Sequence, residues 1–349
     1  MTARHSLFVL LITTLGVTLA SCDLVGDAGT DTPNIDGVYV ANQGNFGDGN
    51  GSVSVFDPTT GQVQPTAIEG LGSIVQGIAV RDTSLLLTAN SAARVDLFST
   101  NGPTQTAQVT GVTSPRYAAF DGPSTAYLTD QSFSGPSAVQ VLDLDRPQPQ
   151  ITATIEVSGS PEGIAVTADR AYAALGAFGD TTLVASINTR QNTLDDEIDV
   201  GCTPRDVTAD ETGDVFALCS NTAEAVILEG ATGTVTSRLS LPDTAETVFG
   251  VGDPSTYSPG ARELYVATDT GVLRIDTQSN TVEATVDVGL SAAPGAVAYD
   301  ASRQELYVAR PAGFTERGTV TVHDRDGTQT DSFRAGIAPT DIAFQQRSR

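Results

Sequence analysis

The amino-acid sequence predicts an all-β fold, a seven-bladed β-propeller closed by its own C-terminal strand. Three observations support this prediction. The chain of 349 residues is rich in Gly, Ala, Val and Thr and has no long helical segment, as expected of many short strands joined by tight turns. One strand pattern recurs seven times at spacings of 41 to 49 residues, a typical length for a four-stranded blade. A second strand pattern also recurs seven times, and the chain begins with the first pattern and ends with the second.

Residues 1–21 are predicted to be a lipoprotein signal peptide. They contain one early basic residue, Arg4, then an uncharged run from Ser6, and they end in small residues before a cysteine. The segment 19–22 (LASC) resembles the lipobox of bacterial lipoproteins, which implies that Cys22 is lipidated and anchors the chain in a membrane. An ordinary secretory signal with an incidental cysteine is the alternative. Residues 22–36 are polar and acidic and predict a flexible tether.

Residues 37–344 are predicted to form the propeller. The first recurring strand reads YVA or a close variant, at Tyr39, Leu86, Tyr127, Tyr172, Phe216, Tyr265 and Tyr307. An alternating strand follows it, as at 52–57, and ends in an Asp that begins a turn. The outermost strand of the blade, the fourth when counted from the channel, comes next, as at 283–288. The second recurring strand, GIAV at 77–80 and 163–166, then begins the next blade.

The C-terminal strand is predicted to close the ring. Because the chain begins with a YVA strand and ends with a GIAV-type strand at 341–344, the first blade lacks an innermost strand of its own. We therefore expect residues 341–344 to pair with the strand that contains Tyr39. Such closure removes the exposed sheet edges that promote aggregation. Residues 345–349 are then left as a tail.

Four of the loops that follow YVA strands carry a phenylalanine at nearly the same offset: Phe46, Phe133, Phe178 and Phe314. In an antiparallel blade these loops open on the same face of the ring as the segments that precede the GIAV strands. An exposed aromatic cluster on one face is typical of a binding surface, so we predict that these rings bind a ligand. The alternative is that each ring packs onto a neighbouring blade and anchors its own loop.

The segments that precede the GIAV strands place polar side chains near the mouth of the central channel. Four of these are predicted to contribute to ligand binding: Gln76, Arg116, Tyr117 and Arg205. Arg116 and Arg205 each follow a proline at equivalent places in the repeat, and two such cations are able to clamp an anionic group. Pairing of the arginines with acids such as Glu162 and Asp206 is the alternative.

The charge composition excludes nucleic acid as a partner. The formal net charge is −24, and all 18 basic residues are arginine. Nucleic acids and anionic lipids require clustered cations, which this chain does not offer. A strongly acidic surface instead fits a protein that stays soluble in high salt, where screening relieves self-repulsion. The sequence therefore favours a halophilic source.

The residue types also argue against an enzyme. The two histidines lie in the signal peptide and in a predicted strand, at His5 and His323, and the chain has neither Lys nor Trp. A histidine-ligated metal or a Ser-His-Asp triad cannot be assembled from this set. We therefore predict no catalytic residue, no metal and no cofactor, with a propeller lyase as the least favoured alternative.

Two cysteines, Cys202 and Cys219, remain once Cys22 is set aside. Outside the cytoplasm an even pair usually forms a disulfide. Because the two residues belong to neighbouring strands of one predicted blade at nearly matching heights, we predict that they are bridged. Two unpaired buried thiols are the alternative.

The repeat resembles the YVTN-type (YncE-like) seven-bladed β-propellers of exported bacterial proteins and archaeal surface-layer proteins. This resemblance covers residues 37–344 and rests on motifs such as 265–267 (YVA) and 160–166 (SPEGIAV). It implies the fold and indicates little about function. The opening segment 42–47 (NQGNFG) also resembles surface lipoproteins of Bacteroidota, some of which bind cobalamin beside an outer-membrane transporter.

These observations predict a non-enzymatic protein, lipid-anchored at the outer membrane or cell surface, that binds a ligand on one propeller face. The leading hypothesis is capture of a nutrient, such as a cobalamin-like molecule, for an outer-membrane transporter. A cell-envelope scaffold that binds another protein or a glycan is the alternative.

Overall fold

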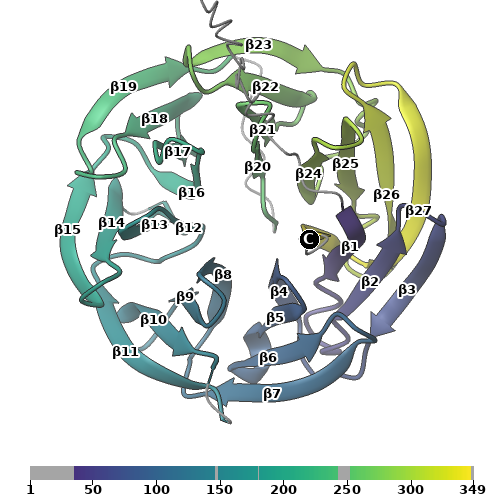
Figure 1. Ribbon diagram of the computed structural model, residues 1–349, viewed down its shortest axis with the longest axis horizontal. Helices are drawn as coiled ribbons and strands as arrows, with labels where there is room; N and C mark the ends of the chain where they lie inside the picture. The colour runs from purple at the N-terminus through teal and green to yellow at the C-terminus, as the bar shows by residue number, and fades with distance from the viewer. Residues whose placement is uncertain (1–34, 146–147, 180, 243–251, 347–349) are drawn as a thin grey trace, which may run out of the picture. The chain divides into compact units, whose positions relative to one another are not determined.

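The computed structural model describes residues 35–145, 148–179, 181–242 and 252–346. Within them the chain folds into seven four-stranded antiparallel sheets that follow one another around a ring (Figure 1). The predicted all-β class and the seven-bladed propeller are confirmed. The predicted signal peptide, the lipidation site Cys22 and most of the tether lie outside the described residues.

The blades are numbered in chain order, and the strands of each blade run from the channel outward. Blade 1 contains β28 (Pro339–Gln346), β1 (Ile35–Asn42), β2 (Ser52–Asp57) and β3 (Gln62–Ile68). Blade 2 contains β4 (Val75–Arg81), β5 (Ser84–Ala89), β6 (Arg94–Ser99) and β7 (Thr104–Thr110), with a short 3-10 helix, η1 (Asn90–Ala92), between β5 and β6. Blade 3 contains β8 (Pro115–Asp121), β9 (Thr125–Asp130), β10 (Ser137–Asp143) and β11 (Gln150–Val157).

The remaining four blades repeat the same order. Blade 4 contains β12 (Ile164–Val166), β13 (Arg170–Ala174), β14 (Leu183–Asn188) and β15 (Thr193–Asp199). Blade 5 contains β16 (Pro204–Ala209), β17 (Val215–Cys219), β18 (Glu224–Leu228) and β19 (Val235–Ser240). Blade 6 contains β20 (Ser255–Ser258), β21 (Glu263–Ala267), β22 (Val272–Asp276) and β23 (Thr281–Val286). Blade 7 contains β24 (Ala296–Asp300), β25 (Glu305–Arg310), β26 (Arg317–Asp324) and β27 (Gln329–Ile337).

The hydrophobic core lies between blades. Each of the seven hydrophobic clusters joins two neighbouring blades, because both faces of the second and third strands are apolar. Tyr127 of β9, for example, packs with Ala171 and Ala173 of the next blade. The tyrosines of the YVA pattern are almost fully buried in these interfaces, and burial of such a side chain contributes roughly 1.5–3 kcal/mol.

The C-terminal strand closes the ring as predicted. β28 pairs antiparallel with β1 in a register that sets Tyr39 against Ala343 and Val40 against Ile342. The predicted bounds of the propeller, 37–344, are too narrow, because the same ladder continues to the pair Ile35 and Gln346. The end of the predicted tether and the start of the predicted tail thus belong to blade 1.

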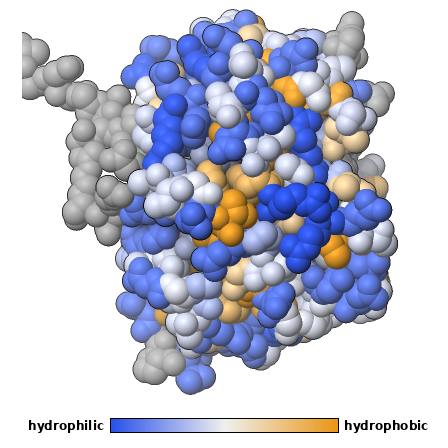
Figure 2. All heavy atoms as spheres, turned by 90° about the vertical axis from the view of Figure 1, so that its right-hand side faces the viewer, coloured by the Kyte–Doolittle hydropathy of each residue, from blue (hydrophilic) through white to orange (hydrophobic). Residues whose placement is uncertain are grey.

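The outer wall of the ring is mainly polar. Figure 2 shows the side that carries β27 and β3, where hydrophilic residues surround small hydrophobic areas. On β15 the acids Asp195, Asp196 and Glu197 follow one another along an outermost strand. No helix among the described residues is both long and apolar enough to cross a membrane.

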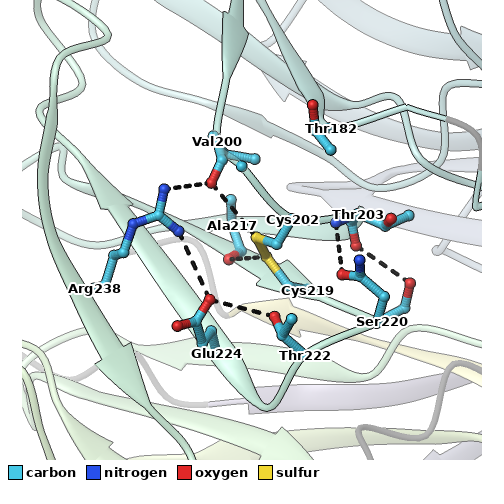
Figure 3. The surroundings of a disulfide bond; sticks show 12 residues. Thr182, Val200, Cys202, Thr203, Ala217, Cys219, Ser220, Thr222, Glu224 and Arg238 are labelled. Atoms are coloured by element: carbon cyan, nitrogen blue, oxygen red, sulfur yellow. Dashed lines mark hydrogen bonds and ion pairs between the residues drawn. A yellow bond between two sulfur atoms is a disulfide. The ribbon is translucent and has the colours of Figure 1, made fainter.

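A disulfide joins Cys202 and Cys219 in blade 5 (Figure 3). Cys219 ends β17 and Cys202 lies two residues before β16, so the bond links the end of β17 to the segment that leads into the innermost strand. Both residues are fully buried. Nearby, Arg238 of β19 donates from Nη2 to the carbonyl oxygen of Val200 at 2.6 Å, which ties the outermost strand to the segment before the bridge.

Candidate functional site

The loops that join the second and third strands of each blade lie on one face of the ring. The segments that lead into the innermost strands lie on the same face. We call this the loop face. Backbone hydrogen bonds join the two kinds of segment directly: the Gly51 N–H donates to the carbonyl of Ser73, and the Gly176 N–H donates to that of Pro204, each at 2.9 Å. The phenylalanine loops and the channel mouth therefore form one continuous surface.

The four loop phenylalanines are exposed. Phe46, Phe133, Phe178 and Phe314 have exposed fractions of 74%, 77%, 61% and 49%, and no other large hydrophobic side chain in the described part of the chain is exposed. Side chains that leave about half or more of their surface in water bury too little area to act as strong anchors. The geometry therefore fits a contact surface better than it fits loop anchoring.

Two of the four rings touch each other. Phe133 lies between β9 and β10, Phe178 lies between β13 and β14 in the next blade, and their ring centroids are 5.6 Å apart with planes tilted by 50°. This is a favourable geometry for an aromatic pair. Among the described residues no ring contact joins Phe46 to Phe314, so the pair in blades 3 and 4 is the one compact aromatic platform there.

The Phe46 loop is held by its own polar groups. The Asn45 N–H donates to Oδ1 of Asn50 at 2.6 Å, and the Gly47 N–H donates to Oδ1 of Asn45 at 2.9 Å. Gly44 has a φ of +81°, and a Cβ there would lie 2.5 Å from the nitrogen of Gly51. A side chain at this position would clash with backbone, so glycine is required for the turn that presents Phe46 outward.

At the channel mouth both predicted arginines face Glu162. Arg116 donates from Nε to Oε2 of Glu162 at 3.0 Å and from Nη2 to Oε1, while Nη2 of Arg205 lies 4.0 Å from the same Oε1. Burial lowers the pKa of the Arg116 guanidinium, but the attraction of Glu162 outweighs it and leaves that pKa above its ordinary value. We predicted that the two arginines clamp an anionic group of a ligand. Glu162 thus occupies the place that this prediction gives to the ligand group. In the described structure Asp206 forms no ion pair with either arginine.

Glu162 also connects the bases of both platform loops. Gln131, two residues before Phe133, donates from Nε2 to Oε2 of Glu162 at 2.7 Å. Arg205 donates from Nη1 to the carbonyl of Ala177, the residue before Phe178, at 2.6 Å. Sequence reasoning missed Gln131. The repeat contains a pattern from which Gln131 could have been predicted: Gln43 and Gln131 each lie four residues after the tyrosine of their YVA strand.

Gln76 and Tyr117 support this network from inside the channel. Arg116 donates from Nη1 to Oε1 of Gln76 at 2.8 Å, and Gln76 donates from Nε2 to the Tyr117 hydroxyl at 3.2 Å. Both residues are buried, and burial raises the pKa of Tyr117 well above its ordinary value. These hydrogen bonds connect both side chains, which are predicted ligand residues, to the Arg116 guanidinium.

A cavity of about 370 Å³ extends along the channel below the mouth. Its walls are mainly the innermost strands, and besides Glu162 three aspartates line it: Asp206, Asp253 and Asp341. Burial is the main cause that raises the pKa of Asp206 to about 6 and that of Asp341 to about 7. Sequence reasoning named only the first of the three, because Asp253 and Asp341 are far apart in the chain and meet only across the closed ring.

Comparison with known proteins assigns a fold and no family. No protein-family model matches the chain, and no curated protein matches it. Among solved structures it resembles a functionally unknown protein from Desulfotomaculum acetoxidans, with 15% identity over 90% of this chain and 100% of that chain and a TM-score of 0.69.

Two further solved structures show the same kind of likeness. Periplasmic gluconolactonase of Pseudomonas aeruginosa has 14% identity over 88% of this chain and 99% of its own, with a TM-score of 0.68. Hydrazine synthase of Kuenenia stuttgartiensis has 17% identity over 77% of this chain and 89% of the matched chain, with a TM-score of 0.65. The protein is thus a seven-bladed β-propeller by fold, and at these identities the likeness extends no further. The YVTN resemblance remains a prediction.

Proposed function

We propose that this protein is a non-enzymatic, lipid-anchored surface protein that binds a ligand on its loop face. The observation that carries the proposal is the exposed, mutually contacting pair of Phe133 and Phe178 beside the polar channel mouth. Exposed aromatic groups next to fixed polar groups are typical of binding sites in which a few residues supply most of the affinity. The bases of the two loops are fixed through Glu162, which limits the conformational entropy lost on binding.

Nutrient capture for an outer-membrane transporter is the specific form that we propose. The lipobox-like segment ending at Cys22 supports anchoring in the outer membrane or at the cell surface, and the segment 42–47 supports a cobalamin-like ligand by resemblance. A cell-envelope scaffold that binds a protein or a glycan is the second candidate, and it is favoured by the spread of four exposed rings over a broad face.

Catalysis by the residues of this chain has little support. One matched structure is a gluconolactonase by its own name, but an identity of 14% carries only the fold. The single histidine of the described chain, His323, is buried in β26 and hydrogen-bonds the carbonyl of Gly327 and the hydroxyl of Thr321. Burial lowers its pKa, which keeps it neutral. It lies one residue before the end of β26, at the end of the strand opposite the loop face.

The test is equilibrium binding of cyanocobalamin to protein that lacks residues 1–21. Changing all four loop phenylalanines to Ser should weaken binding at least tenfold, because the apolar contact area is lost. The unfolding temperature should stay within a few degrees of that of the unchanged protein, since the rings are exposed in the folded state. Two double variants, Phe133→Ser with Phe178→Ser and Phe46→Ser with Phe314→Ser, serve as matched controls, and the first should account for most of the loss.

Two results would contradict the proposal. Unchanged binding in the quadruple variant would remove the rings from the site, and a large loss of stability would show that they anchor their loops. If the unchanged protein does not bind cyanocobalamin but retains envelope proteins or glycans through the same rings, the scaffold candidate replaces nutrient capture.

A further inference from the structure

The loop that carries Phe178 rests on the next blade. We call the residues that lead into an innermost strand its entry segment, and the entry segment of blade 5 is 202–205, which includes the start of β16. The Gly176 N–H donates to the carbonyl of Pro204 at 2.9 Å, and a Cβ on Gly176 would lie 2.5 Å from that oxygen, so the contact requires glycine. Arg205 donates from Nη1 to the carbonyl of the residue after Gly176 at 2.6 Å. The position of the Phe178 loop therefore depends on this entry segment.

The entry segment of blade 5 is in turn held by the end of β17. The disulfide joins its first residue, Cys202, to Cys219 (Figure 3). The Ser220 N–H donates to the carbonyl of Thr203 at 2.8 Å, and the Thr203 N–H donates to Oδ1 of Asn221 at 2.8 Å. One covalent bond and two hydrogen bonds thus fix the entry segment just before the residues that contact the loop.

The two cysteines also pack with the strands that flank the Phe178 loop. They belong to the hydrophobic cluster between blades 4 and 5, together with Ala174 and Val184 of blade 4. Ala174 ends β13 and Val184 is the second residue of β14, so the loop begins and ends beside this cluster. The disulfide therefore lies at the interface between the blade that carries the loop and the blade that supports it.

The end of the second strand contacts an entry segment in other blades as well. In blade 3, Asp130 accepts from the Ser114 N–H at 2.7 Å. In blade 7, Arg310 donates from Nη1 to the carbonyl of Gly289 at 3.2 Å. Both residues share their position in the repeat with Cys219, three residues after the aromatic residue of the YVA pattern. Side chains at this position hold entry segments, and in blade 5 the link is covalent.

On the basis of the proposed function, we infer that the disulfide between Cys202 and Cys219 positions Phe178 for ligand binding and thereby raises the affinity of the loop face. The Phe178 side chain is 61% exposed and contributes little to holding its own loop, so the contacts of the entry segment must hold it. Without the covalent bond the entry segment gains freedom, and the ring samples more positions. A ligand must then order the loop as it binds, which lowers the affinity.

A disulfide also stabilises a fold as a whole, because it restricts the unfolded chain. That effect would act on every blade alike, since amides exchange more easily throughout a structure when the free energy of global unfolding falls. Positioning instead predicts a local change at the base of the Phe178 loop. The Phe46 loop provides the reference, because its Gly51 N–H donates to the carbonyl of Ser73 in the next blade, as the Gly176 N–H does to a carbonyl of blade 5.

Hydrogen–deuterium exchange of protein lacking residues 1–21 tests the inference without a ligand. In the variant Cys202→Ala with Cys219→Ala, the amides at 176–178 should exchange roughly tenfold faster or more than in the unchanged protein, while the amides of the Phe46 loop should keep their rates. If the double variant unfolds, Cys219→Ala alone, which retains one thiol in the buried space, takes its place.

Val226→Ala is the matched control, because it removes buried volume from the same hydrophobic cluster and leaves the disulfide intact. Exchange at 176–178 should not change in this variant. Binding of cyanocobalamin to the same proteins is the second measurement. The double cysteine variant should bind roughly fivefold more weakly or worse, and Val226→Ala should bind as the unchanged protein does.

Failure of this inference is distinguishable from failure of the proposed function. If the unchanged protein does not bind cyanocobalamin, the proposed nutrient capture fails, whereas exchange at 176–178 still decides whether the disulfide positions the loop. Exchange that is unchanged there, or that rises equally in the Phe46 loop, would overturn the inference. Faster exchange at 176–178 together with an unchanged affinity for cyanocobalamin would overturn it as well.

Discussion

Asp206 and Asp341 make the stability of this protein depend on pH in the direction opposite to that of surface carboxylates. Burial raises the pKa of Asp206 to about 6 and that of Asp341 to about 7, whereas in the unfolded chain both have ordinary values near 4. At a pH between the unfolded and the folded pKa values, the folded state binds more protons than the unfolded state. Their contribution to stability is therefore fully present below about pH 4 and is lost as the pH rises through 6 and 7.

This predicts that Asp341→Asn gains stability relative to the unchanged protein as the pH rises. The amide resembles the protonated carboxyl and does not ionise. The unfolding free energy of the variant minus that of the unchanged protein should therefore increase by about 2 kcal/mol between pH 5 and pH 8. Denaturant titrations of both proteins at the two pH values measure this difference. Asp195→Asn, at the outer surface, should show almost no change, and a constant difference for Asp341→Asn would contradict the prediction.

At the scale of single residues, the repeat predicted where the loop phenylalanines and the mouth arginines lie in the chain. It did not predict what Arg116 and Arg205 contact, because the choice between a ligand anion and Glu162 depends on side-chain positions across a blade interface. The acids Asp253 and Asp341 were missed for the same reason, since they are 88 positions apart and meet only around the channel.

The element that closes the ring is β28. It supplies the innermost strand of blade 1, its register with β1 covers Ile35 to Asn42, and Ile342 belongs to the hydrophobic cluster between blades 1 and 7. Without β28 the inner edge of β1 is exposed, and the interface between blades 1 and 7 loses part of its apolar surface. The last strand in the chain thus holds together the first and last blades.

Deleting residues 339–349 should therefore abolish cooperative folding of the monomer. The loss should equal most of the total stability of a domain, about 5–15 kcal/mol, and the exposed edge of β1 should promote oligomers. Thermal unfolding and sedimentation velocity measure the two effects. Deleting only 347–349 is the matched control and should change neither. A truncated chain that stays monomeric and unfolds at the original temperature would show that closure contributes little.

At the scale of the whole molecule, the net charge of −24 is a source of self-repulsion. The acids are spread over the outer wall, as on β15, and few arginines are available to offset them. Salt screens such repulsion over distances beyond about 8–10 Å at physiological ionic strength and over shorter distances at higher concentration. The compact ring should thus gain more from salt than the expanded unfolded chain does.

We expect the unfolding temperature to rise by roughly 5 °C or more between 0.05 M and 2 M NaCl, which corresponds to a gain of one to a few kcal/mol. Differential scanning calorimetry at several salt concentrations measures the change, with 1 M sucrose as a control for effects that do not depend on charge. An unfolding temperature that is independent of salt would contradict this prediction and the expectation of a halophilic source.

The sequence by itself determined the number of blades, the order of strands within each blade, the closing role of the last strand and the chain positions of the four loop phenylalanines. These are properties of local patterns, because strand alternation, turn residues and repeat length are all set by residues close together in the chain. The tertiary structure alone decided that Phe133 and Phe178 touch, that Glu162 occupies the space between the arginines, and that three acids meet in the channel. Those contacts join different blades, and the distances across the ring depend on how the blades pack.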